Sequence, residues 1–345
     1  MKRLLLAALI TFIPEVAFCD SSLTLSIFVD TYSAYAKNNL SNEERPYFTQ
    51  SSQDQDYHLN LASAGLTYDN KVIRGKLVGQ YGDSVDINYI AEPEDDFKFI
   101  QESYLGAYLD DSTTVDLGTF LAHIGAESWL SKDNLNYTRS FIAEFSPYYE
   151  TGIRLSHTFD ANWSGQLLGL NGWQNTTEAK HLALGTQLAY TKNGLTITSN
   201  TFLGEENDGN RLFHNLIVSK NFDSGLSLIG STDLGYQSKS SPVSGTFWGY
   251  SLMGRQALDN TFSINARFES YQDPDGVIVS SITNSDFKAY GASVGLDASL
   301  GSGLFLRGEI KHLFSPNKIF LDDQDEVNND TIFVISLSFF DEEKF

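Results

Sequence analysis

The sequence predicts an all-β fold, a 16-stranded antiparallel transmembrane β-barrel with short periplasmic turns and long external loops. Segments of roughly ten residues alternate apolar and polar side chains, and the connections between them alternate short and long. After the first 19 residues, no window has the run of about 20 apolar residues that a membrane helix needs. The 24 Phe, 17 Tyr and 27 Gly, beside two Met, favour strands over helix bundles.

The alternation is clear in 262–270 (FSINARFES) and in 304–311 (LFLRGEIK). Every second residue is apolar or small, and the residues between them are polar or charged apart from Phe305. Because successive side chains of a strand point to opposite faces, each segment has one apolar and one polar face.

The connections give the number of strands. Seven are short and carry the Asn, Asp and Gly residues of tight hairpins, at 69–70, 110–112, 160–162, 193–194, 223–225, 258–260 and 301–303. Eight others are mostly longer and polar, near 37–55, 83–96, 123–147, 175–180, 205–210, 238–246, 273–285 and 315–330. Fifteen connections predict sixteen strands, with both termini at the short-turn end. This asymmetry is typical of outer-membrane barrels.

Two soluble folds share the alternation, a β-propeller and a β-sandwich array. A propeller repeats a motif every ~40 to 50 residues, and no motif recurs here. Phe159, Tyr190, Phe222 and Phe262 lie beside short turns, in phase with the apolar face of their strands. Such positions are expected in the aromatic girdle of a membrane barrel, although aromatic residues near turns also cover soluble cores.

The start of the chain predicts export. Residues 1–19 resemble a signal peptide that is removed, with a basic start, an apolar run and small residues near Cys19. Lipidation of Cys19 is the alternative. Residues 20–345 are then one barrel domain, with a last strand at 331–340 followed by the charged DEEKF.

The charge of the mature chain bears on its partners. Removing Lys2, Arg3 and Glu15 from 23 basic and 44 acidic residues leaves 21 and 43, a net charge of −22. That balance argues against nucleic acid as a partner.

Three blocks resemble the OmpL-like group of outer-membrane β-barrel porins. They are LSIFVDTYSAYAKN (25–38), QESYLGAYLDDSTTVDLGTFLAHIGAES (101–128) and NLNYTRSFIAEFSPYYETGIRLSH (134–157). The blocks cover most of 23–157, and the second half of the chain is similar in pattern only. The resemblance implies a barrel in the outer membrane of a Gram-negative bacterium and channel activity, and it implies no substrate.

A barrel of sixteen strands encloses an aqueous lumen, which the polar faces of the strands would line. The predicted pore-lining wall residues are Arg74, Lys76, Glu102, Asp116, Arg154, Arg255, Arg267, Glu269, Arg307, Glu309 and Lys311, and Asp233 and Asp297 share their phase. An outward Arg or Lys at the bilayer midplane would cost about 2 to 4 kcal/mol, so these charges face a lumen or the chain is not in a membrane. For any one of them, a salt-bridged wall without a transport role is the alternative.

The connection 123–147 interrupts the alternation for 25 residues, and a loop of this length usually has a function or is disordered. If it folds inward it narrows the pore. Its charged residues, the predicted constriction residues, would then face the basic wall: Glu127, Lys132, Asp133, Arg139 and Glu144. Four aromatic residues would anchor it: Trp129, Tyr137, Phe141 and Phe145. Opposed charges across a constriction decide which solutes pass.

The predicted function is a porin that passes small hydrophilic solutes or ions passively. The six His form no metal-ligand motif and no Gly-x-Ser-x-Gly occurs, so neither a metal or other cofactor nor an enzyme is expected. The acidic stretch 321–330 lacks the central Gly of a calcium loop. The alternatives are a surface-exposed barrel with a plugged lumen that binds a partner or mediates adhesion, and a barrel lipase or protease. The expected partners are outer-membrane lipid and the solutes, with a homotrimer as an open question.

Overall fold

The part of the chain that the computed structural model describes comprises residues 21–39, 44–53, 55–89, 95–176, 182–206, 209–238, 244–283 and 285–345. The predicted signal peptide, 1–19, lies outside these residues. Among the residues described, no helix combines the length and apolar character needed to cross a membrane.

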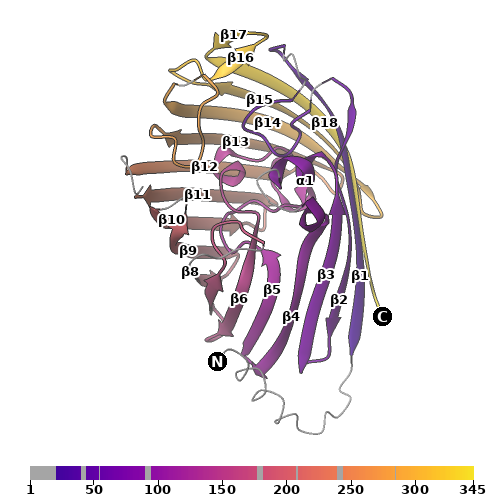
Figure 1. Ribbon diagram of the computed structural model, residues 1–345. Helices are drawn as coiled ribbons and strands as arrows, with labels where there is room; N and C mark the ends of the chain where they lie inside the picture. Colours follow the sequence, from indigo (N-terminus) through magenta and orange to yellow (C-terminus); the bar gives the residue numbers. More distant parts are fainter. Residues whose placement is uncertain are drawn as a thin grey trace.

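Sixteen antiparallel strands close into one barrel (Figure 1), which confirms the predicted fold class. The ring closes between the first and last strands, where Ala36 pairs with Ile332 and Thr24 with Lys344. Its strands are β1 Ser22–Ala36, β2 Tyr57–Asp69, β3 Ile73–Tyr81, β4 Ile100–Asp110, β5 Thr113–Leu121, β6 Tyr149–Thr158, β7 Trp163–Leu170, β8 Ala183–Lys192, β9 Leu195–Glu206, β10 Gly209–Asn221, β11 Leu226–Gln237, β12 Gly245–Ala257, β13 Phe262–Asp273, β14 Phe287–Gly301, β15 Leu304–Phe314 and β18 Asn329–Lys344.

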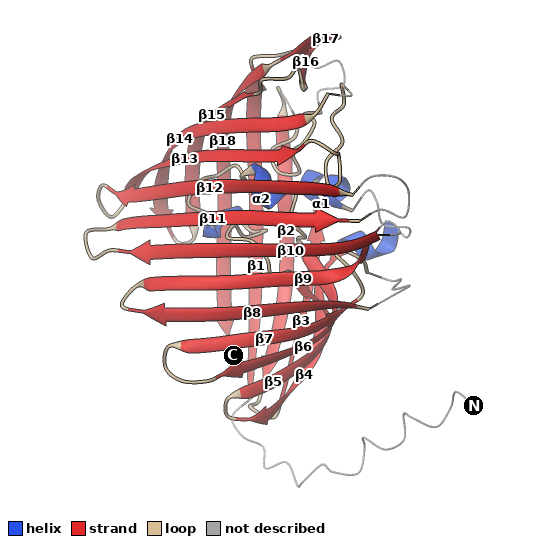
Figure 2. Cartoon of the chain, turned by 90° about the vertical axis from the view of Figure 1, so that its left-hand side faces the viewer, coloured by secondary structure: helices blue, strands red, loops and turns tan. Residues whose placement is uncertain are grey.

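Among the residues described in the long connections are four short helical segments and a small hairpin. The segments are α1 Asp83–Asn88, η1 Asp95–Phe99, η2 Ser131–Asp133 and α2 Phe141–Glu144. The hairpin pairs β16 Phe320–Asp322 with β17 Asp325–Val327 inside the last long connection. Figure 2 shows the hairpin turns gathered at one end of the strands and the helical segments nearer the other end.

The seven predicted short connections are hairpin turns. Asn193 and Gly194 both have positive φ, 51° and 72°, as a two-residue hairpin requires. At Gly303 a Cβ atom would lie 1.8 Å from the carbonyl oxygen of Phe340, so the neighbouring strand leaves room for glycine alone. These turns place both barrel ends, Ser22 and Lys344, at the same rim, because Ser22 pairs with Asp69 beside the first turn.

Two predicted boundaries are wrong. The connection near 205–210 is not long: the ladder between β9 and β10 runs up to the pair Glu206–Gly209, leaving two residues between the strands. The last strand does not stop at 340 but continues through the charged residues to Lys344, because β1 extends to Ser22 and supplies the backbone partners.

The two faces of the wall differ as the alternation predicted. The outer face exposes rows of large apolar side chains, among them Leu66, Leu77, Leu105, Leu117 and Leu167. Phe159, Phe222 and Phe262 are also exposed, beside the turns. Exposed Tyr and Phe residues mark the other rim as well: Tyr35, Tyr57, Tyr81, Tyr236, Phe314 and Phe333. An apolar band between two aromatic girdles is the surface that a bilayer solvates.

The inner face carries buried polar residues, and the inside of the barrel also holds an aromatic core. Phe141 and Phe145 of the connection between β5 and β6 pack against Phe287 of β14 with ring centroids 6.0 and 5.5 Å away. Phe48 and Tyr271 belong to the same cluster. The connection between β5 and β6 is therefore part of the interior.

Candidate pore and the loop that crosses it

The connection 122–148, here called the crossing loop, leaves β5 and returns in the adjacent β6 but reaches the opposite side of the barrel. Asn136 donates to Asn265 of β13 at 2.9 Å and to Ser293 of β14 at 3.3 Å. In the ring of strands, β13 stands eight places from β5 in both directions. The loop thus spans the interior from what we call the near wall (β3 to β6) to the far wall (β12 to β15).

Basic residues of the far wall bind main-chain carbonyl groups of the crossing loop. Arg307 donates to the carbonyl oxygens of Ser131 at 2.7 Å and of Leu135 at 3.0 Å. Arg255 donates to the same Leu135 oxygen at 2.7 Å. Lys311 donates to the carbonyl oxygen of Arg139 at 2.9 Å. These bonds satisfy loop carbonyls that would otherwise be buried without a partner.

Carboxylates of the far wall bind the N–H groups of the same loop. Glu309 accepts from the backbone N–H of Thr138 at 2.9 Å and from its hydroxyl at 2.7 Å. Glu269 accepts from the backbone N–H of Phe141 at 2.6 Å. Hydrogen bonds to charged groups are the stronger kind, so both signs of charge on the wall fix the loop backbone.

Arg267 lies at the centre of this contact. Its guanidinium is 3.5 Å from a carboxylate oxygen of Glu127, 3.4 Å from Glu269 and 3.5 Å from Glu309, and it also donates to Thr138. The Arg267 side chain is fully buried. A buried charge of this kind depends on its partners, because the loss of one partner leaves an uncompensated charge.

The near wall has its own ion pairs, and the crossing loop does not cover them to the same extent. Asp116 accepts from Arg74 at 2.6 Å and from Arg154 at 2.8 Å, and Lys76 pairs with Glu102 at 2.6 Å. The three basic side chains remain partly exposed. Together with the far-wall groups, every predicted wall residue lies on the inner face and in an ion pair or a hydrogen bond.

The five predicted constriction residues do not behave alike. Glu127 faces Arg267 of the wall, as expected. Lys132 pairs instead with the adjacent Asp133 at 2.7 Å and lies over the ring of Phe340. Lys132 differs from Glu127 because the carboxylate of the adjacent Asp133 is closer to it than any charge of the wall.

The side chains of Arg139 and Glu144 both contact Tyr148. The Arg139 guanidinium lies 4.0 Å from the ring centroid of Tyr148 and donates to the carbonyl oxygen of Ala143 at 2.9 Å. Glu144 accepts from the hydroxyl of Tyr148 at 2.7 Å and from the backbone N–H of Thr49 at 2.9 Å. Arg139 therefore contacts the ring of Tyr148 and Glu144 its hydroxyl group.

The predicted aromatic anchors are all in contact with other aromatic or polar groups. Besides Phe141 and Phe145, Trp129 packs edge-on against Tyr148 and donates from its indole N–H to Gln80 of β3 at 3.0 Å. The hydroxyl of Tyr137 lies 3.4 Å from the carboxylate of Asp30.

Burial changes the acidity of two loop side chains. Burial raises the pKa of Glu127, and the charge of Arg267 opposes that rise. Burial also raises the pKa of the Tyr148 phenol well above its ordinary value. Glu127 thus holds its proton more tightly than a solvated glutamate.

Two inner-wall carboxylates that were not predicted from the sequence also fix the crossing loop. Asp30 of β1 accepts from Ser131 at 2.8 Å and from Asn60 at 2.7 Å. Glu150 of β6 accepts from the ring of His123 at 2.8 Å, at the start of the loop. A signal for Asp30 was present, since it has the inward phase of β1 and lies in the first block of the family resemblance.

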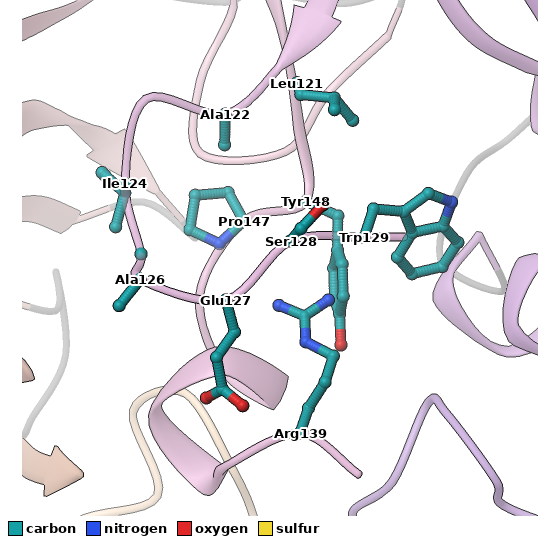
Figure 3. Close-up of a pocket in the computed structure, with 11 residues that line it drawn as sticks. Leu121, Ala122, Ile124, Ala126, Glu127, Ser128, Trp129, Arg139, Pro147 and Tyr148 are labelled. Carbon is teal, nitrogen blue, oxygen red and sulfur yellow. The ribbon is translucent and has the colours of Figure 1, made fainter. Parts of the chain in front are cut away.

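Two cavities border the crossing loop. The inner cavity, of about 260 Å³, lies between its two limbs, and Figure 3 shows the Arg139 guanidinium there between Glu127 and the ring of Tyr148. The outer cavity, of about 390 Å³, is lined among others by Glu144, Tyr148, Trp173, Glu206 and Arg211. Tyr148 lines both cavities. Within the described ranges, no group of three His, Cys, Asp or Glu side chains is placed to hold a metal ion.

A closed sixteen-strand barrel with an apolar outer band, a charged inner wall and an inward-folded loop defines the class of outer-membrane porins and related channels. The chain belongs to the family described as "Putative beta-barrel porin-2, OmpL-like", whose model matches residues 22–340. The family named from the three sequence blocks is thereby confirmed.

Several solved structures of outer-membrane proteins share the fold at low sequence identity. The anion-selective porin from Comamonas acidovorans is 13% identical with a TM-score of 0.61, over 93% of this chain and 100% of that one. The outer membrane channel DcaP of Acinetobacter baumannii is 11% identical with a TM-score of 0.62, over 92% and 97%. The trimer form of OmpT, an outer membrane protein of Vibrio cholerae, is 9% identical with a TM-score of 0.62, over 93% and 99%. No curated protein sequence matches the chain.

Proposed function

We propose that the protein is a channel of the bacterial outer membrane through which small hydrophilic solutes or ions diffuse, and that the crossing loop narrows its lumen. Diffusion needs no cofactor and no catalytic step. Lipid surrounds the apolar band, and a homotrimer is consistent with the trimer form of one structural relative.

The observation that carries the proposal is the fixation of the crossing loop on the far wall. Its backbone is bound through residues 131 to 141 by Arg255, Arg267, Glu269, Arg307, Glu309 and Lys311. A loop bound by both signs of charge stays within the lumen. Solutes then pass beside it, where near-wall charges and the loop cavities remain accessible.

A second function, a surface-exposed binding or adhesion protein with a plugged lumen, is favoured by the aromatic core inside the barrel. Phe48, Phe141, Phe213, Phe247 and Phe287 are all buried there. Such a cluster fills part of the interior, and a lumen filled throughout would conduct no ions.

Planar-bilayer recording separates the two functions. The wild-type protein is expected to give discrete conductance steps in KCl, and a silent protein that inserts into the bilayer would favour the plugged barrel.

Excision of 128–143 from the crossing loop is expected to enlarge each step, because it removes the residues that reach the far wall. A matched control removes 321–326, most of the β16–β17 hairpin. This control is expected to leave the step unchanged. Equal steps for wild type and the 128–143 deletion would contradict the narrowing role while leaving channel activity intact.

A further inference from the structure

Two charged side chains beside Tyr148 have polar atoms without partners. Arg139 is 3% exposed and Glu144 8% exposed. Within the described part of the chain, Nε and Nη1 of Arg139 and Oε1 of Glu144 are buried and make no hydrogen bond. A buried polar group without a partner is costly, so such atoms are suited to a ligand that supplies the missing bonds.

We propose that the two cavities on either side of Tyr148 form one binding site for a small zwitterion such as an α-amino acid, with its carboxylate on Arg139 and its ammonium group on Glu144. The inference deepens the proposed function and rests on it, since the solute would meet this site on its way through the lumen.

Arg139 has a fixed guanidinium with unpartnered donors for a carboxylate. Its Nη2 is fixed by the carbonyl oxygen of Ala143, and the ring of Tyr148 lies against the guanidinium plane. The other two nitrogens, Nε and Nη1, lie on either side of Cδ, so each can donate a separate hydrogen bond to a carboxylate oxygen. The side chain is thus held in place with two donors that have no partner.

Glu144 supplies the complementary end. One carboxylate oxygen is occupied by the Tyr148 hydroxyl and the backbone N–H of Thr49. The other oxygen, Oε1, is buried and makes no hydrogen bond. Because Arg139 contacts the face of the Tyr148 ring and Glu144 contacts its hydroxyl, the two charges flank one aromatic side chain.

The charges around the cavities favour a zwitterion over an anion or a cation. The inner cavity has Glu127 and Arg139, and the outer cavity has Glu144, Glu206 and Arg211. A simple carboxylate would add a negative charge beside Glu127 and Glu144, and a simple amine would add a positive charge beside Arg139. A zwitterion adds no net charge and places an opposite charge against each of Arg139 and Glu144, which a neutral polyol cannot do.

The test measures how probe solutes interrupt the KCl current of the full-length protein in planar bilayers. The probes are L-alanine, L-lactate (a carboxylate without an ammonium group), ethanolamine (an ammonium group without a carboxylate) and glycerol. We expect the half-blocking concentration of L-alanine to be at least tenfold lower than that of each other probe. Equal half-blocking concentrations for L-alanine, L-lactate and glycerol would overturn the proposal.

Substitutions locate the effect. Arg139→Gln and Glu144→Gln are each expected to raise the half-blocking concentration of L-alanine at least tenfold, while each variant still gives discrete KCl steps, which shows that the barrel is folded and open. The matched control is Lys288→Gln, which removes a charge paired with Asp286 away from both cavities, and it is expected to change nothing. If L-alanine blocks the Arg139→Gln variant at the same concentration as it blocks the wild type, the binding site does not include Arg139 and the proposal is wrong.

Equilibrium binding of radiolabelled L-alanine to the detergent-purified protein separates this inference from the proposed function. Binding that Arg139→Gln abolishes, in a protein that conducts no KCl current, would support the site and contradict the channel. A KCl current without L-alanine binding would support the channel and overturn the site.

Discussion

The near wall and the far wall of the barrel carry the same kinds of residue in the same inward phase, yet their charges have different surroundings. The side chains of Arg74 and Lys76 on the near wall are 25% and 31% exposed. Those of Arg267 and Lys311 on the far wall are 0% and 1% exposed. The crossing loop makes the difference, since it packs directly on Arg267 and Lys311 and covers Arg74 and Lys76 less. A charged side chain on the barrel wall therefore holds the structure together where the crossing loop covers it, and it faces solvent where the loop does not.

The largest effect is expected when the central far-wall charge is removed. Arg267→Met leaves Glu127, Glu269 and Glu309 buried together without their shared cation. Breaking a buried ion cluster in this way costs about 3 to 5 kcal/mol. Urea unfolding in detergent, followed by tryptophan fluorescence, measures the loss of unfolding free energy. A loss below ~1 kcal/mol would mean that the two walls do not differ.

A much smaller effect is expected on the near wall. Lys76→Met removes the partner of Glu102, but this lysine is partly solvated, and exposed ion pairs contribute about 0 to 1 kcal/mol. Loss of a cation from an open wall should instead make the channel more selective for cations, measured as a shift of the reversal potential in a KCl gradient. An unfolding penalty as large as that of Arg267→Met would contradict the contrast between the walls.

The smallest effect concerns pH. Because burial raises the folded-state pKa of Glu127 above 4.5, its contribution to stability is full below pH 4.5 and is lost as the pH rises through the raised value. The free energy of unfolding of the wild type, measured relative to Glu127→Gln, should therefore fall as the pH rises from 4.5. If the difference in unfolding free energy between the wild type and Glu127→Gln does not change with pH, Glu127 ionises as freely in the folded protein as in solvent.

Most of the barrel could be predicted because its signals are local. A period of two assigns each residue to a face, and Asn193-Gly194 or Gly301-Ser302-Gly303 marks a hairpin without reference to distant residues. The errors lie where local signals end. At Glu206 and Lys344 the partner strand continues, so backbone pairing carries the strand past polar residues that look like a loop.

The candidate site could be predicted only in part. The inward phase identified the wall charges, and the length of 123–147 identified the loop. The partner of each charge could not be predicted, because Glu127 and Arg267 are 140 positions apart and no local pattern joins them. The opposite case is Lys132 and Asp133, which are adjacent in the sequence and form an ion pair with each other instead of with the wall.

The sequence by itself determined that the chain forms strands with one apolar and one polar face, that turns gather at one rim, and that a long segment breaks the pattern. These properties depend on a residue and its near neighbours. Only the tertiary structure decided that this segment crosses to β13, that Arg267 is buried while Arg74 is not, and that Arg139 and Glu144 meet at Tyr148. Closing the ring brings distant strands to one loop, and the resulting contacts depend on the shape of the enclosed space rather than on the order of the residues.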